Sequence, residues 1–311
     1  MKIQVYFPGF SCSIQDELVV PEFNLRIRQN VSPTLIPDHW KEWLGIITLT
    51  LIQKSPIVLE WDHVGERSYE DEIQLFYLGL YVTKQLSCDP YPIGIKFCIE
   101  ADGSYRVNGH FHGYKFQFQK GNHNIAFDKD DLKKTVTYYK LLKNLRTSYS
   151  QSRVTRAIGL FQKLISEADA IERLHITVRI VEAFLSMTHN SKKLEKATGQ
   201  NLFLKRILQF VSNFNETDLR ECYQIRSNIS HMNSLHDQVS ECYWTTDKIN
   251  QTLFRMEGLV RYLIQNILNH PEILPEFLGE ELPFWSKSEE NRNSIWKFSK
   301  FDWDGCKLGV L

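Results

Sequence analysis

The segment Asp218–His231 places an arginine where the helical pattern calls for an apolar residue. If this segment is a helix, the residues that share a face with Arg226 are apolar or aromatic: Leu219, Cys222, Tyr223 and Ile229. A guanidinium in such a stripe costs free energy unless it is paired or lines a wet cleft. Arg226 is therefore expected either to close a buried ion pair or to serve a binding or catalytic site.

A carboxylate partner for this arginine is available upstream. Glu182 lies near the edge of the apolar stripe of a helix expected over Ala168–Met187, one turn after Val178. A carboxylate and a guanidinium can form a two-point contact. The sequence thus predicts that Glu182 pairs with Arg226.

His231 follows Arg226 by five residues, which separates the two side chains by about 140° on a straight helix. They would converge only if the helix ends between them or if two chains contribute to one site. The polar residues Asn228, Ser230 and Asn233 favour a helix end in this region.

The segment Tyr223-Gln-Ile-Arg-Ser-Asn-Ile-Ser-His231, on the fourth of a run of expected helices, resembles the Arg-x(4–6)-His motif of HEPN domains. The similarity is greatest to the Apea-like branch, and it covers roughly residues 152–270. The upstream run Ile171–Leu185 resembles the second helix of that family, whose glutamate would be Glu182. Two positions differ from the family pattern: Met232 stands where many members have Gly, and Ser227 follows the arginine.

This resemblance implies metal-independent RNA cleavage without a cofactor, in which the 2′-OH attacks the adjacent phosphorus and leaves a 2′,3′-cyclic phosphate. His231 would move a proton, because an imidazole titrates near neutral pH. Arg226 would hold the phosphate and stabilise charge in the transition state. Asn228 or Ser227 would orient these groups, with Glu182 and Tyr223 in support. The family also implies a homodimer through the helical domain and a role as a toxin or antiviral defence effector.

Two other functions stay open. The helical part could be a non-catalytic HEPN-like module that binds a protein partner or RNA. Alternatively, His110 and His112 share a strand face and could hold a metal ion with a third ligand from His39, His63 or His123. Phosphate-binding loops, dinucleotide fingerprints and the Gly-x-Ser-x-Gly elbow are missing from the sequence, which argues against nucleotide hydrolases, dehydrogenases and standard esterases.

The charge of the chain is balanced overall but not locally. Its 311 residues include 37 Lys+Arg and 37 Asp+Glu, which argues against non-specific coating of long nucleic acids. Residues 151–270 hold 15 basic and 12 acidic side chains, and residues 271–311 hold 5 and 8. A basic cluster gives a weak prediction of RNA contact, although a solvated face is the simpler interpretation. Its members are Lys192, Lys193, Lys196, Lys205 and Arg206.

The sequence predicts a cytoplasmic protein without a membrane span. Its start has no apolar run of signal-peptide length, and no stretch of about 18 apolar residues occurs. The six cysteines are scattered without a Cys-x-x-Cys pair, which argues against a disulfide framework or a cysteine zinc site.

The predicted fold class is α+β. Residues 1–150 are expected to form a mixed α+β domain of sensory or regulatory role. Its expected elements are strands at Met1–Phe7 and Pro56–Trp61, helices at Pro37–Leu51, Tyr69–Leu86 and Asp130–Tyr149, and a hairpin around Asp102-Gly103. Residues 151–270 are expected to form an all-α bundle. Its helices are expected at Arg153–Ser166, Ala168–Met187, Leu202–Asn213, Asp218–Ser230 and Asp247–Asn269. Residues 271–311 form an aromatic-rich tail, whose tryptophans are expected to pack on the body or on a partner.

Overall fold

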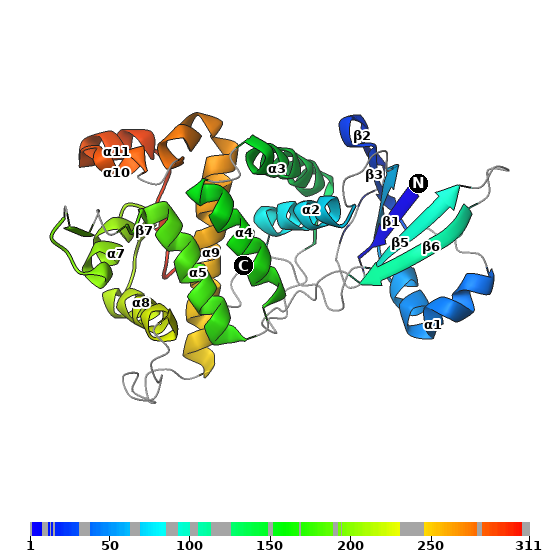
Figure 1. Cartoon of the computed structure of the whole chain (residues 1–311), viewed down its shortest axis with the longest axis horizontal. Coiled ribbons are helices and arrows are strands. Elements are labelled where there is room, and N and C mark those ends of the chain that lie inside the picture. Colours follow the sequence, from blue (N-terminus) through cyan, green and yellow to red (C-terminus); the bar gives the residue numbers. More distant parts are fainter. Residues whose placement is uncertain are drawn as a thin grey trace. The chain divides into compact units, whose positions relative to one another are not determined.

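The computed structural model confirms the α+β class and shows two compact units, residues 1–140 and 141–311 (Figure 1). The division lies inside a helix, Lys129–Ser148, and this helix ends close to the boundary at residue 150 that the sequence predicts. The structure describes residues 2–7, 12, 14, 16–30, 38–62, 69–84, 93–99, 105–112, 126–148, 152–167, 169–188, 192–193, 195–230, 246–278 and 282–306. In parts of these ranges, including the last turn of the helix that carries Arg226, only the backbone is described.

The first unit contains a six-stranded sheet in which every neighbouring pair is antiparallel. The spatial order is β2-β3-β4-β1-β5-β6. The strands are β1 (Lys2–Tyr6), β2 (Leu18–Val20), β3 (Leu25–Gln29), β4 (Ile57–Asp62), β5 (Ile93–Ile99) and β6 (Tyr105–His112), with a 3-10 turn η1 (Pro21–Phe23) between β2 and β3. The predicted β5–β6 hairpin is therefore confirmed, and its Asp102-Gly103 turn lies outside the described residues.

Helices cover both faces of this sheet, and the strands β1 and β4 accordingly have consecutive buried residues, whose side chains point to opposite faces. On one face, Tyr6, Val58 and Ile95 pack with Leu44 and Ile52 of α1 (Asp38–Gln53). On the other face, aromatic rings link β4 to α2 (Tyr69–Thr83) and α2 to α3 (Lys129–Ser148): Trp61 lies 5.8 Å from Phe76, and Phe76 lies 6.0 Å from Tyr139.

The second unit is a bundle built around one central helix. Its helices are α4 (Arg153–Ser166), α5 (Ala170–Leu185), α7 (Gly199–Ile207), α8 (Glu216–Ser230) and α9 (Thr246–Asn269). Ten of the 16 residues of α5 are buried, because this helix packs against α4, α8 and α9 at once. Three of these helices begin at side-chain caps, namely Ser152 for α4, Asp169 for α5 and Thr198 for α7.

The tail completes the second unit, as its tryptophan content predicted. It contains η2 (Pro271–Phe277), α10 (Pro283–Ser286), α11 (Glu289–Ile295) and β8 (Phe301–Asp302). Trp303 is fully buried, Trp296 is 3% exposed, and the Trp285 indole donates a hydrogen bond to the Phe184 carbonyl. The ring of Phe210 packs against Trp296 at 4.6 Å. This contact anchors the tail on the bundle.

Three details of the chain differ from the sequence-based expectation. The helix predicted at Leu202–Asn213 begins earlier, at Gly199, because Thr198 caps it, and it ends earlier, at Ile207. The residues that follow form β7 (Val211–Ser212), which pairs in parallel with β8 of the tail. The short strands β2 and β3 were not predicted.

Among the described residues, no helix combines the length and the apolar composition needed to cross a bilayer.

Candidate functional site

Arg226 occupies the position on α8 that the sequence indicated. The buried residues of this helix are Asp218, Leu219, Cys222, Tyr223 and Ile225. Arg226 falls within the same arc, at the spacing of a 3.6-residue repeat. Its side chain is nevertheless 26% exposed, because it borders a hollow in the surface instead of filling the core.

The predicted pair between Arg226 and Glu182 is present. The Arg226 Nε donates a hydrogen bond of 2.9 Å to Glu182 Oε2, and the Glu182 side chain is 10% exposed. The contact uses one nitrogen, so it is not the two-point contact that we expected. The two terminal nitrogens of Arg226 form no hydrogen bond with a described residue. Glu182 therefore holds the guanidinium in place and leaves its outer edge available to a ligand.

The pKa of Glu182 reflects this half-buried position. Burial raises the pKa of the carboxyl above its usual range, and the charge of Arg226 opposes that increase. Lys192, a member of the predicted basic cluster, and Arg179 also lower it. The site thus collects positive charge around one partly desolvated carboxylate.

Tyr223 supports the arginine from the preceding turn of α8. Its ring centroid lies 5.9 Å from the Arg226 guanidinium carbon and 5.3 Å from the ring of Phe203 in α7. A Cβ atom at Gly199, the first residue of α7, would collide with the Tyr223 hydroxyl. Gly199 is therefore needed for this packing. The sequence does not single out Gly199, because the contact depends on the packing of α7 against α8.

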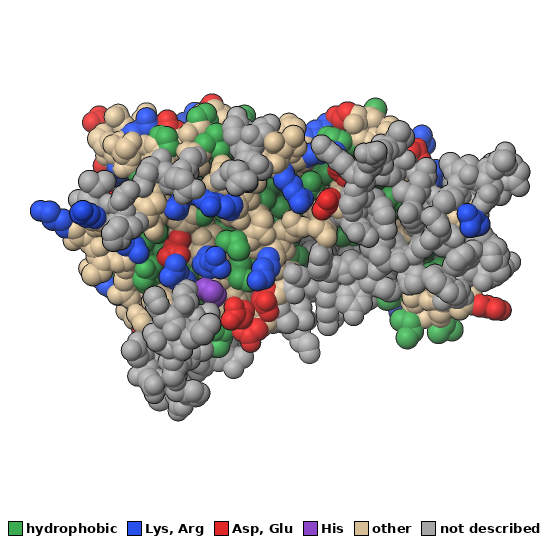
Figure 2. All heavy atoms as spheres, in the orientation of Figure 1, with side chains coloured by type: hydrophobic (Ala, Val, Ile, Leu, Met, Phe, Trp, Pro, Cys, Tyr) green, Lys and Arg blue, Asp and Glu red, His purple; other side chains and the backbone are tan. Residues whose placement is uncertain are grey.

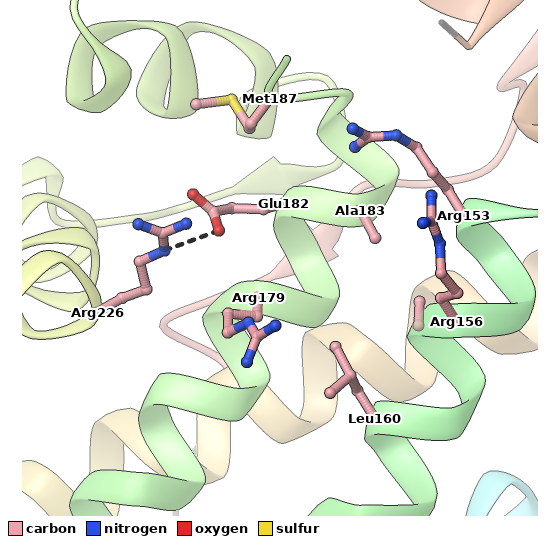
Figure 3. A pocket seen from close by; sticks show the side chains of 9 residues that line it. Arg153, Arg156, Leu160, Arg179, Glu182, Ala183, Met187 and Arg226 are labelled. Carbon is pink, nitrogen blue, oxygen red and sulfur yellow. Dashed lines mark hydrogen bonds and ion pairs between the residues drawn. The ribbon is translucent and has the colours of Figure 1, made fainter. Parts of the chain in front are cut away.

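A cavity of about 370 Å³ opens beside Arg226. Its described lining comes from three helices: Arg153, Arg156, Ala157 and Leu160 of α4, Arg179, Glu182 and Ala183 of α5 with the following Met187, and Arg226 of α8. In Figure 3, Arg226 lies on one side of α5 and Arg153 and Arg156 on the other, with Glu182 and Ala183 between them. Helices α4 and α5 each contribute residues three and four positions apart, which share one face, and α8 contributes Arg226.

The chemistry of this cavity is that of an anion site. Four guanidinium groups and a single carboxylate give the described lining a formal charge of +3, counted as four minus one. Guanidinium groups bind phosphate and carboxylate oxygens through paired N–H donors. Figure 2 shows Lys and Arg side chains on the face over α4 and α5, with Asp and Glu side chains among them. The sequence had not indicated Arg153, Arg156 and Arg179, because only the packing of α4 on α5 brings them to Arg226.

The structure brings only part of the predicted site into view. Ser227 is partly exposed and does not line the cavity. The backbone of Asn228 belongs to α8, and its side chain lies outside the described set. His231 also lies outside the described residues.

The predicted basic cluster needs a correction at Arg206. This side chain is buried: its Nε contacts Glu195 Oε1 at 3.0 Å, and its Nη1 donates to the carbonyls of Leu185 and Ser186 at 2.6 and 2.9 Å. Arg206 thus satisfies the carbonyls at the end of α5 and is not a surface cation for RNA. Lys205 is exposed but pairs with Glu195 at 2.8 Å. No member of the cluster lines the described wall of the cavity: Lys192, Lys193, Lys196, Lys205 and Arg206.

The metal-site alternative falls largely outside the described part of the chain. The strand β6 carries His110 and His112, whose side chains are not described. Within the described side chains, no group of three or more His, Cys, Asp or Glu residues is arranged to hold a metal ion.

The candidate site consists of Arg226, oriented by the Glu182 carboxylate, at the edge of a cavity lined by further arginines. Comparison of the chain with models of protein families, with curated proteins and with solved structures gave no significant match.

Proposed function

We propose that this protein is a metal-independent endoribonuclease of the HEPN type, with Arg226 and His231 as its catalytic residues. The observation that carries the proposal is the arrangement of Arg226, held by Glu182 through one hydrogen bond at the wall of a cavity with a formal charge of +3. A pre-oriented cation beside a partly enclosed space is what transition-state stabilisation of a phosphoryl group requires.

The reaction needs three events at one phosphodiester. The 2′-OH oxygen attacks the adjacent phosphorus and gives up its proton, the bond from phosphorus to the 5′-oxygen breaks, and that oxygen gains a proton. The products are a 2′,3′-cyclic phosphate and a 5′-hydroxyl. In this proposal the terminal nitrogens of Arg226 donate to the non-bridging oxygens as charge develops there. His231 exchanges the protons, and Ser227 and Asn228 orient the reacting groups.

The biological role and the oligomeric state are part of the same proposal. The motif resemblance favours a cytoplasmic toxin or antiviral defence effector that acts as a homodimer through the helical unit. Two copies would allow Arg226 and His231 of both chains to share one cleft. The N-terminal unit would then sense a trigger or bind a protein partner.

The proposal is tested by incubating purified protein with 5′-labelled single-stranded RNA in EDTA and analysing the product ends. We expect cleavage that leaves 2′,3′-cyclic phosphates. Arg226→Ala and His231→Ala should each remove it while circular dichroism stays unchanged. Arg220→Ala is the matched control, because Arg220 lies on the same helix, pairs with the exposed Glu216 and does not line the cavity. Activity that survives in both site variants overturns the assignment.

A second candidate, a non-catalytic module that binds RNA or a protein partner, is favoured by one observation. The described lining of the cavity contains cations and no histidine. Binding of RNA without cleavage under any condition supports this candidate. Cleavage that disappears in EDTA supports instead a metal site that involves His110 and His112.

A further inference from the structure

The first turn of α4 carries charges of the sign that a helix start disfavours. The backbone N–H groups of a helix N-terminus are partially positive, so acidic residues stabilise it and basic residues do not. Four other helices follow this rule, because α3, α5, α8 and α11 all have acidic residues in their first turns. The first turn of α4 has no acidic residue and carries Arg153 at its first position, with Arg156 three residues later.

These two arginines line the cavity, and they are also accessible to solvent. Arg153 and Arg156 line it from α4, and Arg179 lines it from α5 (Figure 3). Arg156 and Arg179 are exposed, and Arg179 forms no ion pair with a described residue. Glu182 is the sole carboxylate in the described lining, and its hydrogen bond goes to Arg226. An anion in the cavity would interact favourably with the guanidinium groups that line it and with the helix start beside them.

We infer that Arg153, Arg156 and Arg179 form a second phosphate subsite, which holds the phosphodiester next to the one bound by Arg226. This inference rests on the proposed function and names its substrate: single-stranded RNA with at least two consecutive phosphates. The volume of about 370 Å³ is that of a site for a small ligand, and a duplex is far too wide to enter it. The subsite binds substrate and does not take part in bond breaking.

Binding of non-cleavable RNA tests the subsite directly. The probes are fluorescent 2′-O-methyl oligonucleotides with one, two or three phosphodiesters, titrated with the full-length protein by fluorescence anisotropy at several NaCl concentrations. For the wild type, affinity should increase roughly ten-fold from one to two phosphodiesters. Arg156→Gln/Arg179→Gln should lose that gain, and its salt slope should fall by about 0.7, because the subsite binds one phosphate and each phosphate neutralised on a single strand contributes about 0.7.

The double variant changes two exposed side chains, so its fold should be retained. Lys163→Gln/Lys297→Gln is the matched control, since it removes two exposed charges of the same unit that do not line the cavity. Adding Arg153→Gln should deepen the loss if the triple variant still folds. A double variant that keeps the length dependence and salt slope of the wild type overturns the subsite.

Cleavage kinetics separate failure of the subsite from failure of the proposed function. A binding subsite predicts that Arg156→Gln/Arg179→Gln raises KM about ten-fold with kcat nearly unchanged, whereas Arg226→Ala lowers kcat. If Arg226→Ala abolishes cleavage while the double variant behaves as wild type, the nuclease assignment holds and the subsite is wrong. If the wild-type protein does not cleave RNA, and the double variant binds the oligonucleotides more weakly than wild type does, the subsite holds and the nuclease assignment is wrong.

Discussion

Two arginine–glutamate pairs connect the central helix α5 to its neighbours, and they are built differently. In the core pair, Arg173 of α5 meets Glu257 of α9, and the two side chains are 6% and 5% exposed. In the cavity pair, Glu182 of α5 meets Arg226 of α8, and the arginine is 26% exposed. The bundle therefore contains one arginine–glutamate pair that is buried and one in which the arginine is partly exposed to solvent.

The use of the guanidinium nitrogens separates the pairs. In the core pair, Arg173 contacts Glu257 through both Nε and Nη2, and its Nη1 donates to the Glu167 carbonyl at 3.2 Å. In the cavity pair, Arg226 uses Nε alone. An arginine whose donors are consumed by the fold serves the fold, whereas one with donors left over at a cavity wall is available to a ligand.

Breaking the core pair should give the largest loss of stability. Arg173→Met removes the guanidinium that contacts the buried Glu257 carboxylate, and breaking a buried pair in this way costs about 3–5 kcal/mol. We expect a decrease of that size in the free energy of unfolding, measured by urea denaturation with tryptophan fluorescence. The tryptophans of the tail report on this unit, because Trp296 and Trp303 pack into it.

The double variant Arg173→Met/Glu257→Met is the control for that experiment. With both charges removed, apolar side chains fill the space and most of the stability should return. An unchanged urea midpoint in the single variant would contradict the structural role of the core pair.

The same substitution in the cavity pair should cost less. Arg226→Met should lower the free energy of unfolding by about 1–2 kcal/mol, between the values typical of exposed and buried pairs, because solvent reaches the arginine. Cleavage, in contrast, should fall by about 10²–10³-fold, the loss seen when one transition-state donor is removed. A destabilisation equal to that of Arg173→Met would show that the two pairs have the same structural role.

The contrast also shows what the sequence could predict. Helical periodicity assigns residues to faces, so the place of Arg226 in an apolar arc and its pairing with Glu182 followed from spacing alone. Periodicity does not say which faces of different helices meet. The convergence of Arg153, Arg156 and Arg179 on Arg226 depends on the packing of α4 and α8 against α5, and only the structure provides it.

Errors in the sequence analysis have the same origin. Arg206 belongs to a run of basic residues, and its burial depends on Glu195 and on two carbonyls at the end of α5, eleven or more residues away. The strand β2 has three residues, too few for an alternation to stand out. The tail was predicted more accurately, because buried tryptophans are recognised from composition without knowledge of their partners.

The smallest predicted effect is a pH dependence that belongs to the cavity pair. Burial raises the pKa of Glu182 above the usual value of 4.5, so the folded state binds a proton there more tightly than the unfolded state does. Stability contributed by a carboxyl of this kind is present at low pH and is lost as pH rises through the folded pKa. Arg226 lowers this pKa, and removing Arg226 should therefore raise it further.

The cost of Arg226→Met should accordingly grow between about pH 4.5 and pH 7.5, by a fraction of the 1–2 kcal/mol expected at neutral pH. Urea unfolding at four pH values measures it, with Glu182→Gln and Glu182→Gln/Arg226→Met as controls in which the dependence should vanish. A cost that stays constant or decreases as the pH rises would show that Arg226 does not lower the pKa of Glu182, and it would contradict a favourable charge interaction within the cavity pair.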